Sequence, residues 1–156
     1  PAGGRWGFTL VEILVVISVI GLLLGMPLVG ITAAQRSSAR KNTAIMIKLI
    51  STAIQRYQAE WGDYPPGAGG TAGSEDLYRA LSRPGGGGPF ISGEYPPHQD
   101  TDKDGLEEMV DHWKRPIAYT HHRHYEGDPK ASEYRLVSPG LDGKPGTEDD
   151  IAHWKN

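Results

Sequence analysis

The chain of 156 residues has a net charge of −3 and no cysteine, which excludes a disulfide scaffold, a thiol nucleophile and a thiolate metal site. Charge divides between two parts of the chain. Residues 1–61 carry six Lys or Arg and two Asp or Glu, about +4, and residues 62–156 carry ten and seventeen, about −7. An acidic second part argues against nonspecific nucleic-acid binding, which needs basic surface to neutralise phosphates.

The first element is an apolar segment of 24 residues, from Phe8 to Ile31, in which Glu12 is the only charged residue. Because a helix of about 20 apolar residues can span a bilayer, residues 8–31 predict a transmembrane helix. A plain single-pass anchor is the simplest interpretation, but a carboxylate within a membrane span is costly and marks a functional residue with a partner. One such partner is an α-amino group on a neighbouring chain, which Phe8 would carry after cleavage behind Gly7.

The segment Gly7-Phe8-Thr9-Leu10-Val11-Glu12 at the head of this helix resembles the class III signal of type IV pilins and type II secretion pseudopilins. The resemblance implies that residues 1–7 are a leader, which a prepilin peptidase removes after Gly7 before it methylates the new N-terminus at Phe8. It also implies that Glu12 is the assembly carboxylate. Basic residues flank the span on both sides, so the positive-inside rule gives no orientation; the resemblance implies a cytoplasmic N-terminus.

Residues 32–61 continue as an amphipathic helix, with apolar residues at roughly helical spacing and basic residues between them. We expect this part to pack under a soluble head, whereas residues 8–31 suit lipid or the core of a filament. Gly21, Gly25 and Pro27 interrupt the helix, and proline removes a backbone donor. They predict a kink or local melting of the helix. It is either a tolerated kink or, as the resemblance to pilin-like proteins implies, a stretch that unwinds when subunits leave the membrane for a filament.

Residues 62–156 form the predicted head. The glycine-rich stretches 67–73 and 85–88 are interpreted as loops, because they lack the Gly-Lys-Ser/Thr ending of a phosphate loop. Between them, residues 74–82 predict a short helix with Ser74 as its N-cap.

Two short runs in the head have strand character, residues 117–120 and 134–138. They fit a small antiparallel sheet packed on the long helix. The predicted fold class is therefore α+β.

The order of motifs in the head resembles the major pseudopilins of type II secretion. The matching motifs are Tyr64-Pro65, Leu77-Tyr78-Arg79-Ala80-Leu81, Asp111-His112-Trp113-Lys114-Arg115-Pro116 and the ending from Ser138 to Ile151. The resemblance implies a pilin-like fold. Two departures stand out: the family's usual Asp-Pro-Trp-Gly turn reads Asp-His-Trp-Lys here, and residues 85–104 are longer and richer in glycine and acidic residues.

The C-terminal loop offers hard oxygen ligands, because Asp142, Asp149 and Asp150 lie in a stretch rich in glycine and proline. Such a loop can supply the roughly six to eight oxygens that calcium prefers, although an ordinary solvated acidic loop has the same composition. The corresponding loop of the major pseudopilin binds calcium, so the resemblance implies Ca²⁺ as the cofactor, with these three carboxylates as ligands. Further main-chain or hydroxyl oxygens are expected from Leu136, Ser138 and Lys144.

A second acidic stretch begins at Asp100 and has the spacing that opens a calcium loop. Asp100, Asp102 and Asp104 are therefore candidate ligands of a second metal, and Asp111 falls at the twelfth position of an EF-hand loop. Prolines on both sides of this stretch disfavour the flanking helices of a true EF-hand.

The histidines at positions 121, 122 and 124 form a further cluster, with His98 and His112 elsewhere in the head. If His122 and His124 shared one face of a strand, they would suit a transition metal. Exposed histidines in a hairpin turn are the favoured interpretation.

No catalytic arrangement is supported by residue spacing, so no enzymatic activity is predicted. The resemblance implies a structural subunit of the bacterial inner membrane, with its head in the periplasm, that polymerises into a periplasmic pseudopilus for protein export. Its partners would be further copies of the chain, the prepilin peptidase, an inner-membrane assembly platform, minor pilin-like subunits and membrane lipid.

Two alternatives remain open at this point. One is the major subunit of a surface type IV pilus for adhesion, motility or DNA uptake. The other is a membrane-tethered calcium-binding module that never polymerises, and Glu12 argues against it because a simple tether gains nothing from a buried carboxylate.

Overall fold

The computed structural model describes residues 9–25, 27–83, 88–92, 94–124 and 133–155, with side chains between 22 and 32 left out. The chain divides into two compact units, residues 1–37 and 38–156. The predicted cleavage residue Gly7 and the predicted N-terminus Phe8 lie outside the described residues.

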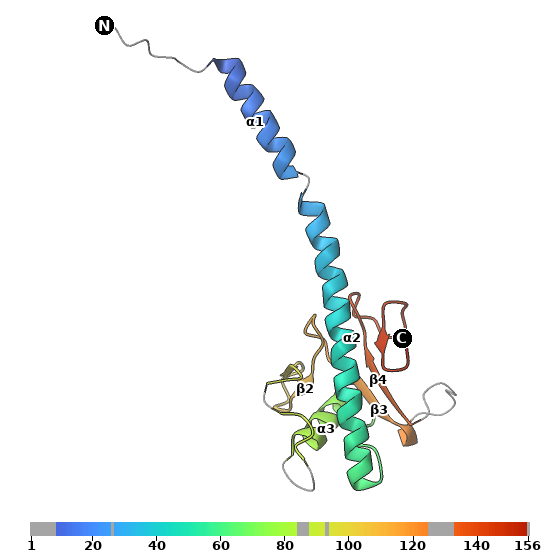
Figure 1. The fold of residues 1–156 in the computed structure, drawn as a ribbon. Helices are drawn as coiled ribbons and strands as arrows, with labels where there is room; N and C mark the ends of the chain where they lie inside the picture. The colour runs from blue at the N-terminus through green and yellow to red at the C-terminus, as the bar shows by residue number, and fades with distance from the viewer. Residues whose placement is uncertain (1–8, 26, 84–87, 93, 125–132, 156) are drawn as a thin grey trace. The chain divides into compact units, whose positions relative to one another are not determined.

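Two helices make up the N-terminal third of the chain, α1 (Leu10–Gly25) and α2 (Pro27–Trp61) (Figure 1). In the described part of the chain, no helix combines the length and the apolar character that a membrane crossing needs. The span expected over residues 8–31 is therefore not shown and stays a prediction. So does the kink at Pro27, because the adjoining residue 26 lies outside the described part.

The large apolar side chains of α1 are exposed to solvent along the described part of the helix. They are Leu10, Val11, Ile13, Leu14, Val15, Val16, Ile17, Val19 and Ile20, each between 47% and 82% exposed. Because the sequence of α1 is apolar on every side and has no amphipathic face, its apolar side chains are exposed all around the helix.

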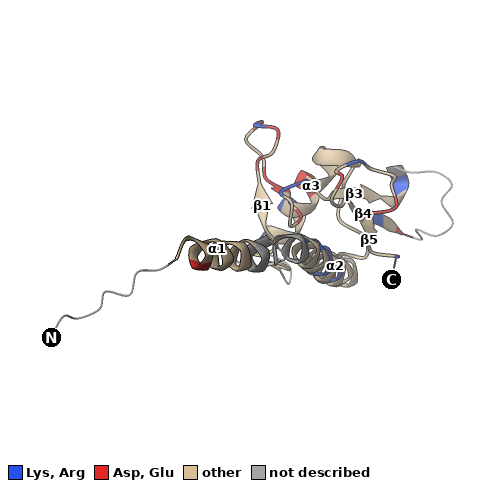
Figure 2. Ribbon diagram, turned by 90° about the horizontal axis from the view of Figure 1, so that it is seen from above, with Lys and Arg blue, Asp and Glu red and all other residues tan. Residues whose placement is uncertain are grey.

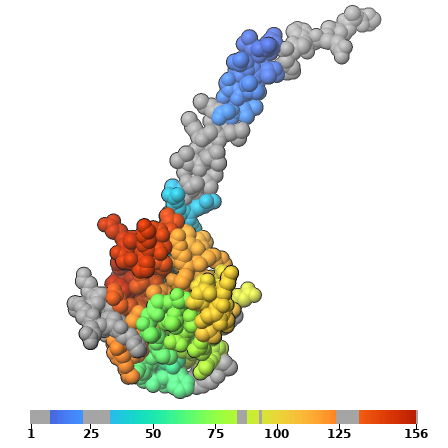
Figure 3. Space-filling view, turned by 180° about the vertical axis from the view of Figure 1, so that it is seen from behind, coloured from blue at the N-terminus to red at the C-terminus, as the bar shows by residue number. Residues whose placement is uncertain are grey.

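The head is built on the C-terminal half of α2, which carries α3 (Gly70–Ser82) and two small antiparallel sheets on one side (Figures 1 and 2). The larger sheet has the order β3 (Ala118–His121), β4 (Tyr134–Ser138) and β5 (Ile151–Ala152). The smaller sheet pairs β1 (His98–Gln99) with β2 (Glu108–Met109), and the segment that carries it (yellow) lies beside α3 (green) in Figure 3.

The head's core forms where one face of α2 meets α3 and both sheets. Fully buried apolar side chains on α2 recur at helical spacing, at Met46, Ile47, Ile50 and Ile54. They pack with buried residues of the other elements, namely Leu77, Leu81, Met109, Ile117, Tyr119, Tyr134, Leu136 and Ile151. The predicted packing of residues 32–61 under the head is thus confirmed for the part that begins near Ala39.

The short helix of the head begins earlier than predicted. Helix α3 starts at Gly70 with Gly69 as its N-cap, so the loop expected over 67–73 is wrong for its last four residues. Ser74 is not a cap: it is fully buried, and its Oγ accepts a hydrogen bond from the Met109 amide at 3.1 Å. The glycines serve close packing, because a Cβ on Gly73 would lie 2.0 Å from the carbonyl oxygen of Tyr119.

The two predicted strands are confirmed to within one residue as β3 and β4, which pair in register with Tyr119 opposite Leu136. Helix α2 ends at Trp61, where the predicted helix over residues 32–61 ends. The fold class is α+β, as predicted.

Candidate functional site

The N-terminal motif forms a reciprocal hydrogen-bonded cap at the start of α1. The Thr9 amide and hydroxyl donate to Glu12 Oε2 at 2.8 and 2.9 Å, and the Glu12 amide donates to Thr9 Oγ1 at 3.3 Å. This is a capping box, in which Thr and Glu three residues apart satisfy free amides of the first turn. The predicted assembly carboxylate is therefore held at the N-terminal end of α1, where the helix dipole favours a negative charge.

A tight turn organised by Asp111 connects β2 to β3. Asp111 is buried, and its Oδ1 accepts hydrogen bonds from the amides of Trp113 and Arg115 at 2.8 and 3.0 Å. Its Oδ2 accepts one from the Ser138 hydroxyl at 2.7 Å. Lys114 adopts a positive φ of 64°, which glycine adopts without cost. Asp111 thus belongs to the turn, and its placement as the last ligand of an EF-hand is wrong.

The C-terminal loop, residues 139–150, folds onto its own carboxylates. Asp149 Oδ2 accepts from the Asp142 amide at 2.9 Å, and Asp150 Oδ2 accepts from the Gly146 amide at 2.7 Å. The hydroxyl of Thr147 donates to Asp149 Oδ1 at 2.5 Å. This bond and the Asp142 amide lower the pKa of Asp149 to about 2, so the carboxylate stays ionised at neutral pH.

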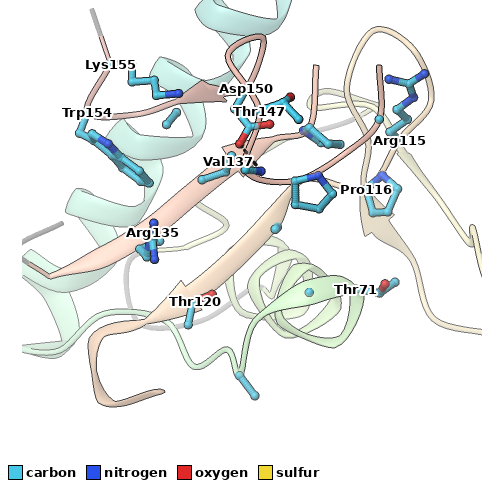
Figure 4. Close-up of a pocket in the computed structure, with 18 residues that line it drawn as sticks. Thr71, Arg115, Pro116, Thr120, Arg135, Val137, Thr147, Asp150, Trp154 and Lys155 are labelled. Atoms are coloured by element: carbon cyan, nitrogen blue, oxygen red, sulfur yellow. Dashed lines mark hydrogen bonds between the residues drawn. The ribbon is translucent and has the colours of Figure 1, made fainter. Parts of the chain in front are cut away.

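An open pocket borders this loop, with Arg115 and Pro116 on one side and Thr147 and Asp150 on another (Figure 4). The Arg115 guanidinium donates to the carbonyl of Gly140. Gly143 adopts a positive φ of 71°, which favours glycine, and a Cβ there would lie 2.8 Å from the Arg115 guanidinium carbon. The Asp111 turn and the C-terminal loop are therefore joined through Ser138 and Arg115.

The comparisons with known proteins agree on one kind of relative, although no family model matches the chain. The chain is 28% identical over 150 residues to the type II secretion system core protein G of Escherichia coli, and the match covers 95% of this chain and 90% of that protein. The figures for the same protein of Pseudomonas aeruginosa are 29% over 157 residues, with 96% and 95% covered, and for Klebsiella michiganensis 27% over 159 residues, with 95% and 92% covered. The chain is thus similar over nearly its whole length to core proteins G of type II secretion systems.

A solved structure of the major pseudopilin from the type 2 secretion system of enterohaemorrhagic Escherichia coli is also similar. Its TM-score is 0.47 at 21% identity, with 78% of this chain and 87% of that chain covered.

The C-terminal loop of this chain has the donor chemistry of a calcium site. Asp150 is 7% exposed, and its Oδ1 is a buried oxygen with no hydrogen-bond partner, which a cation would satisfy. Its three carboxylates do not form one of the convergent acidic groups found among the described residues, because Asp142 and Asp149 are bound to loop amides and Thr147 instead.

The three further oxygens expected in this site have other partners in the structure. The Ser138 hydroxyl is bonded to Asp111, the Leu136 carbonyl accepts from the His153 amide at 3.1 Å, and the Lys144 carbonyl accepts from the Thr147 hydroxyl at 3.2 Å. Carbonyl oxygens have a second lone pair, so Leu136 and Lys144 keep the capacity to bind a cation.

The second acidic stretch is arranged differently from the prediction. Asp100 accepts hydrogen bonds from the amides of Lys103 and Gly105, at 2.6 and 3.1 Å, and so holds the loop rather than joining a convergent group. Asp102 and Asp104 instead converge with Glu75 and Glu108. The loop lies between strands β1 and β2 and not between helices, which excludes an EF-hand.

The histidine cluster is also rearranged. His122–His124 form a short 3₁₀ helix, so His122 and His124 do not share a strand face, and the side chain of His124 lies outside the described residues. His121 is buried, not exposed as predicted, and its Nε2 lies 3.2 Å from Asp63 Oδ1. Burial lowers the pKa of His121, and the bond to Asp63 opposes this in part.

Glu75 and Glu108 are the acidic residues that sequence reasoning missed. They lie 33 positions apart and meet only because α3 packs on β2. Both carboxylates lie at positions that the fold buries. That burial, and not their spacing in the sequence, marks them.

Proposed function

We propose that this chain is a structural subunit that polymerises into a periplasmic pseudopilus of type II protein secretion. The observation that carries the proposal is similarity to core proteins G over 95% of the chain. The exposed apolar surface of α1 supports it, because apolar patches larger than a few hundred Å² are usually covered by a partner or a membrane.

Processing and membrane insertion belong to the same proposal. A prepilin peptidase would cleave after Gly7 and methylate Phe8, and residues 8–31 would anchor the subunit in the inner membrane before assembly. Minor pilin-like subunits and an inner-membrane assembly platform are the further partners. The capping box at Thr9 and Glu12 supports the proposal, since it starts α1 immediately behind the cleavage position.

Calcium binding by the C-terminal loop is part of the proposal as well, with the Asp142, Asp149 and Asp150 carboxylates as ligands. Bound only by the folded head, the ion would stabilise it by about 2.7 kcal/mol at a hundredfold excess over its dissociation constant. We expect Asp150→Asn to reduce this stabilisation, measured as a smaller calcium-dependent shift in the melting temperature of the purified full chain. Glu148→Gln, on the same loop, is the matched control; a melting temperature of the parent chain indifferent to calcium would contradict the proposal.

Deletion of the gene tests the function itself. The proposal predicts that exported proteins accumulate in the periplasm while surface filaments, seen by electron microscopy, persist. Normal secretion with loss of surface filaments would make the chain a surface type IV pilin instead. Complementation with the parent gene is the control for effects on neighbouring genes.

A further inference from the structure

Four carboxylates converge in the head at a place remote in sequence from the C-terminal loop. Glu75 on α3, Asp102 and Asp104 on the loop between β1 and β2, and Glu108 on β2 each place one carboxylate oxygen within 4.8 Å of the others. Figure 2 shows acidic residues, in red, both on α3 and along the loop beyond β1. We call these four residues the α3–β2 acidic cluster.

Half of this cluster is buried. Glu108 is fully buried and Glu75 is 8% exposed, whereas Asp102 and Asp104 are exposed. Burying a charged carboxylate is unfavourable unless it is paired and hydrogen-bonded. The cluster therefore has a solvent-facing side through which an ion can enter and a buried side that is costly to leave uncompensated.

Glu108 supplies an observation independent of the clustering. Its Oε2 accepts a hydrogen bond from the Thr101 amide at 2.7 Å, but its Oε1 is a buried oxygen without a hydrogen-bond partner. Buried carboxylate oxygens in native proteins nearly always have a hydrogen-bond donor or a bound ion. The unpartnered Oε1 of Glu108 therefore points to a bound ligand.

The Lys, Arg and His residues that the structure describes do not compensate the cluster. Among the residues that the structure describes, no Lys, Arg or His forms an ion pair with any of its four members. The four carboxylates therefore lie together without a paired cation from the described residues to offset their mutual repulsion.

Asp100 fixes the loop that brings the two exposed members in. Its carboxylate accepts from the amides of Lys103 and Gly105, and Lys103 and Gly105 both adopt a positive φ, of 65° and 91°. The loop is thus folded by Asp100 around its own backbone. Asp104 Oδ1 accepts from the Leu106 amide at 2.8 Å, which leaves the carboxylate of Asp102 and the second oxygen of Asp104 available to the cluster.

We propose that the α3–β2 acidic cluster is a second calcium site, with the carboxylates of Glu75, Asp102, Asp104 and Glu108 as its protein ligands. Oxygens about 2.4 Å from one Ca²⁺ ion lie at most about 4.8 Å from each other, which matches the spacing of the cluster. Four carboxylates, some bidentate, together with water meet the roughly six to eight oxygens that calcium accepts. The ion would fasten the 100–106 loop to α3.

Calcium titration of the purified full chain in detergent tests the site by stoichiometry. The variant D102N/D104N changes only exposed side chains, so it is expected to fold, and it should bind one calcium ion fewer per chain than the parent. The variant D142N/D150N separates this site from the C-terminal loop. A chain that carries both D142N/D150N and D102N/D104N should lose calcium binding at both loops. Asp76→Asn and Glu107→Gln are matched controls, because each neighbours a cluster member in sequence and lies outside the cluster.

Hydrogen exchange gives a second readout that does not depend on counting ions. Calcium should slow exchange in residues 100–106 at least tenfold in the parent chain and in D142N/D150N, but not in D102N/D104N. Two results would overturn the site: D102N/D104N binding as many ions as the parent with unchanged affinity, or Asp76→Asn and Glu107→Gln losing an ion as well, which would reveal a general effect of charge. Neither result bears on the proposed role in secretion, which the gene deletion tests.

Discussion

The first helix and the head-bearing half of α2 use the same apolar residue types with opposite outcomes. On α1, Val, Ile and Leu side chains from Leu10 to Ile20 are all at least 47% exposed. On α2, Met46, Ile47, Ile50 and Ile54 are at most 3% exposed and form the centre of the head's core.

The difference lies in what the chain supplies for each helix to pack against. The later part of α2 has one apolar face, and α3 and the two sheets cover it. Helix α1 is apolar on every side, and among the described residues of its own unit no element covers it. Burial of apolar surface contributes about 25 cal/mol per Å². Under the proposed function, α1 would gain this stabilisation from lipid or from other copies of the chain, whereas the head gains its own from within.

Loss of the Glu12 carboxylate on α1 is expected to have the largest effect, a loss of filament yield without a change in head stability. Glu12→Ala should reduce filament yield at least tenfold while leaving the melting temperature of the head unchanged, because the residue lies in the other unit. Filament yield is measured by shearing and immunoblotting, and head stability by circular dichroism of the purified chain.

Thr9→Val separates assembly from helix capping in this test. It removes the capping hydroxyl, worth about 1 kcal/mol, but keeps the carboxylate, so assembly should fall much less than with Glu12→Ala. Equal losses in the two variants would mean that Glu12 acts by capping its own helix alone.

The head responds to the opposite kind of change. Ile50→Ala, at a fully buried position, should destabilise the head by about 2–4 kcal/mol through lost transfer energy and a cavity. Leu49→Ala is the matched control, since Leu49 is 51% exposed on the same helix, and it should change head stability by less than about 0.5 kcal/mol. Chemical denaturation of both variants measures this; similar losses would contradict the described packing of α2.

A smaller gain is expected at the Asp111 turn. Lys114→Gly removes the cost of a positive φ, about 1–2 kcal/mol, but adds freedom to the unfolded chain worth about 0.4–1 kcal/mol. The head should therefore become more stable by about 0.5–1 kcal/mol in denaturant titrations. Lys114→Ala retains the strained φ and should show no such gain; a loss of stability with glycine would contradict the positive φ.

The smallest effect concerns pH. Burial lowers the pKa of His121 below its ordinary value of about 6.5, so the unfolded chain binds a proton there more readily than the folded head. Its contribution is fully present above about pH 6.5 and is lost as pH falls below that value. His121→Gln should flatten this part of the stability profile, whereas His112→Gln, at an exposed position, should not.

The sequence predicted the elements whose signals are local. Proline and glycine after Trp61 mark the end of α2, and the apolar runs of β3 and β4 are long enough to show strand character. Strands β1, β2 and β5 have two residues each, too few for any period. The predicted start of α3 was wrong because Gly73 is set by its tertiary contact with Tyr119 and not by local loop propensity.

The candidate sites show the same limit. The N-terminal motif is contiguous, so its residues could be named from the sequence. The α3–β2 acidic cluster joins Glu75 to a loop more than 25 residues away, and only the packing of α3 on β2 brings Glu108 beside it. Asp100 fits the spacing of a calcium loop equally well, but its carboxylate is occupied by loop amides.

Cysteine labelling of assembled filaments tests the claim that other copies of the chain cover α1. Because the chain has no native cysteine, Ile17→Cys on α1 and Ser92→Cys on the exposed surface of the head can be compared with a hydrophilic maleimide. In intact filaments, Ile17→Cys should stay unlabelled while Ser92→Cys reacts, and both should react once the filaments are dissociated in SDS. Equal labelling of the two positions in intact filaments would contradict the account.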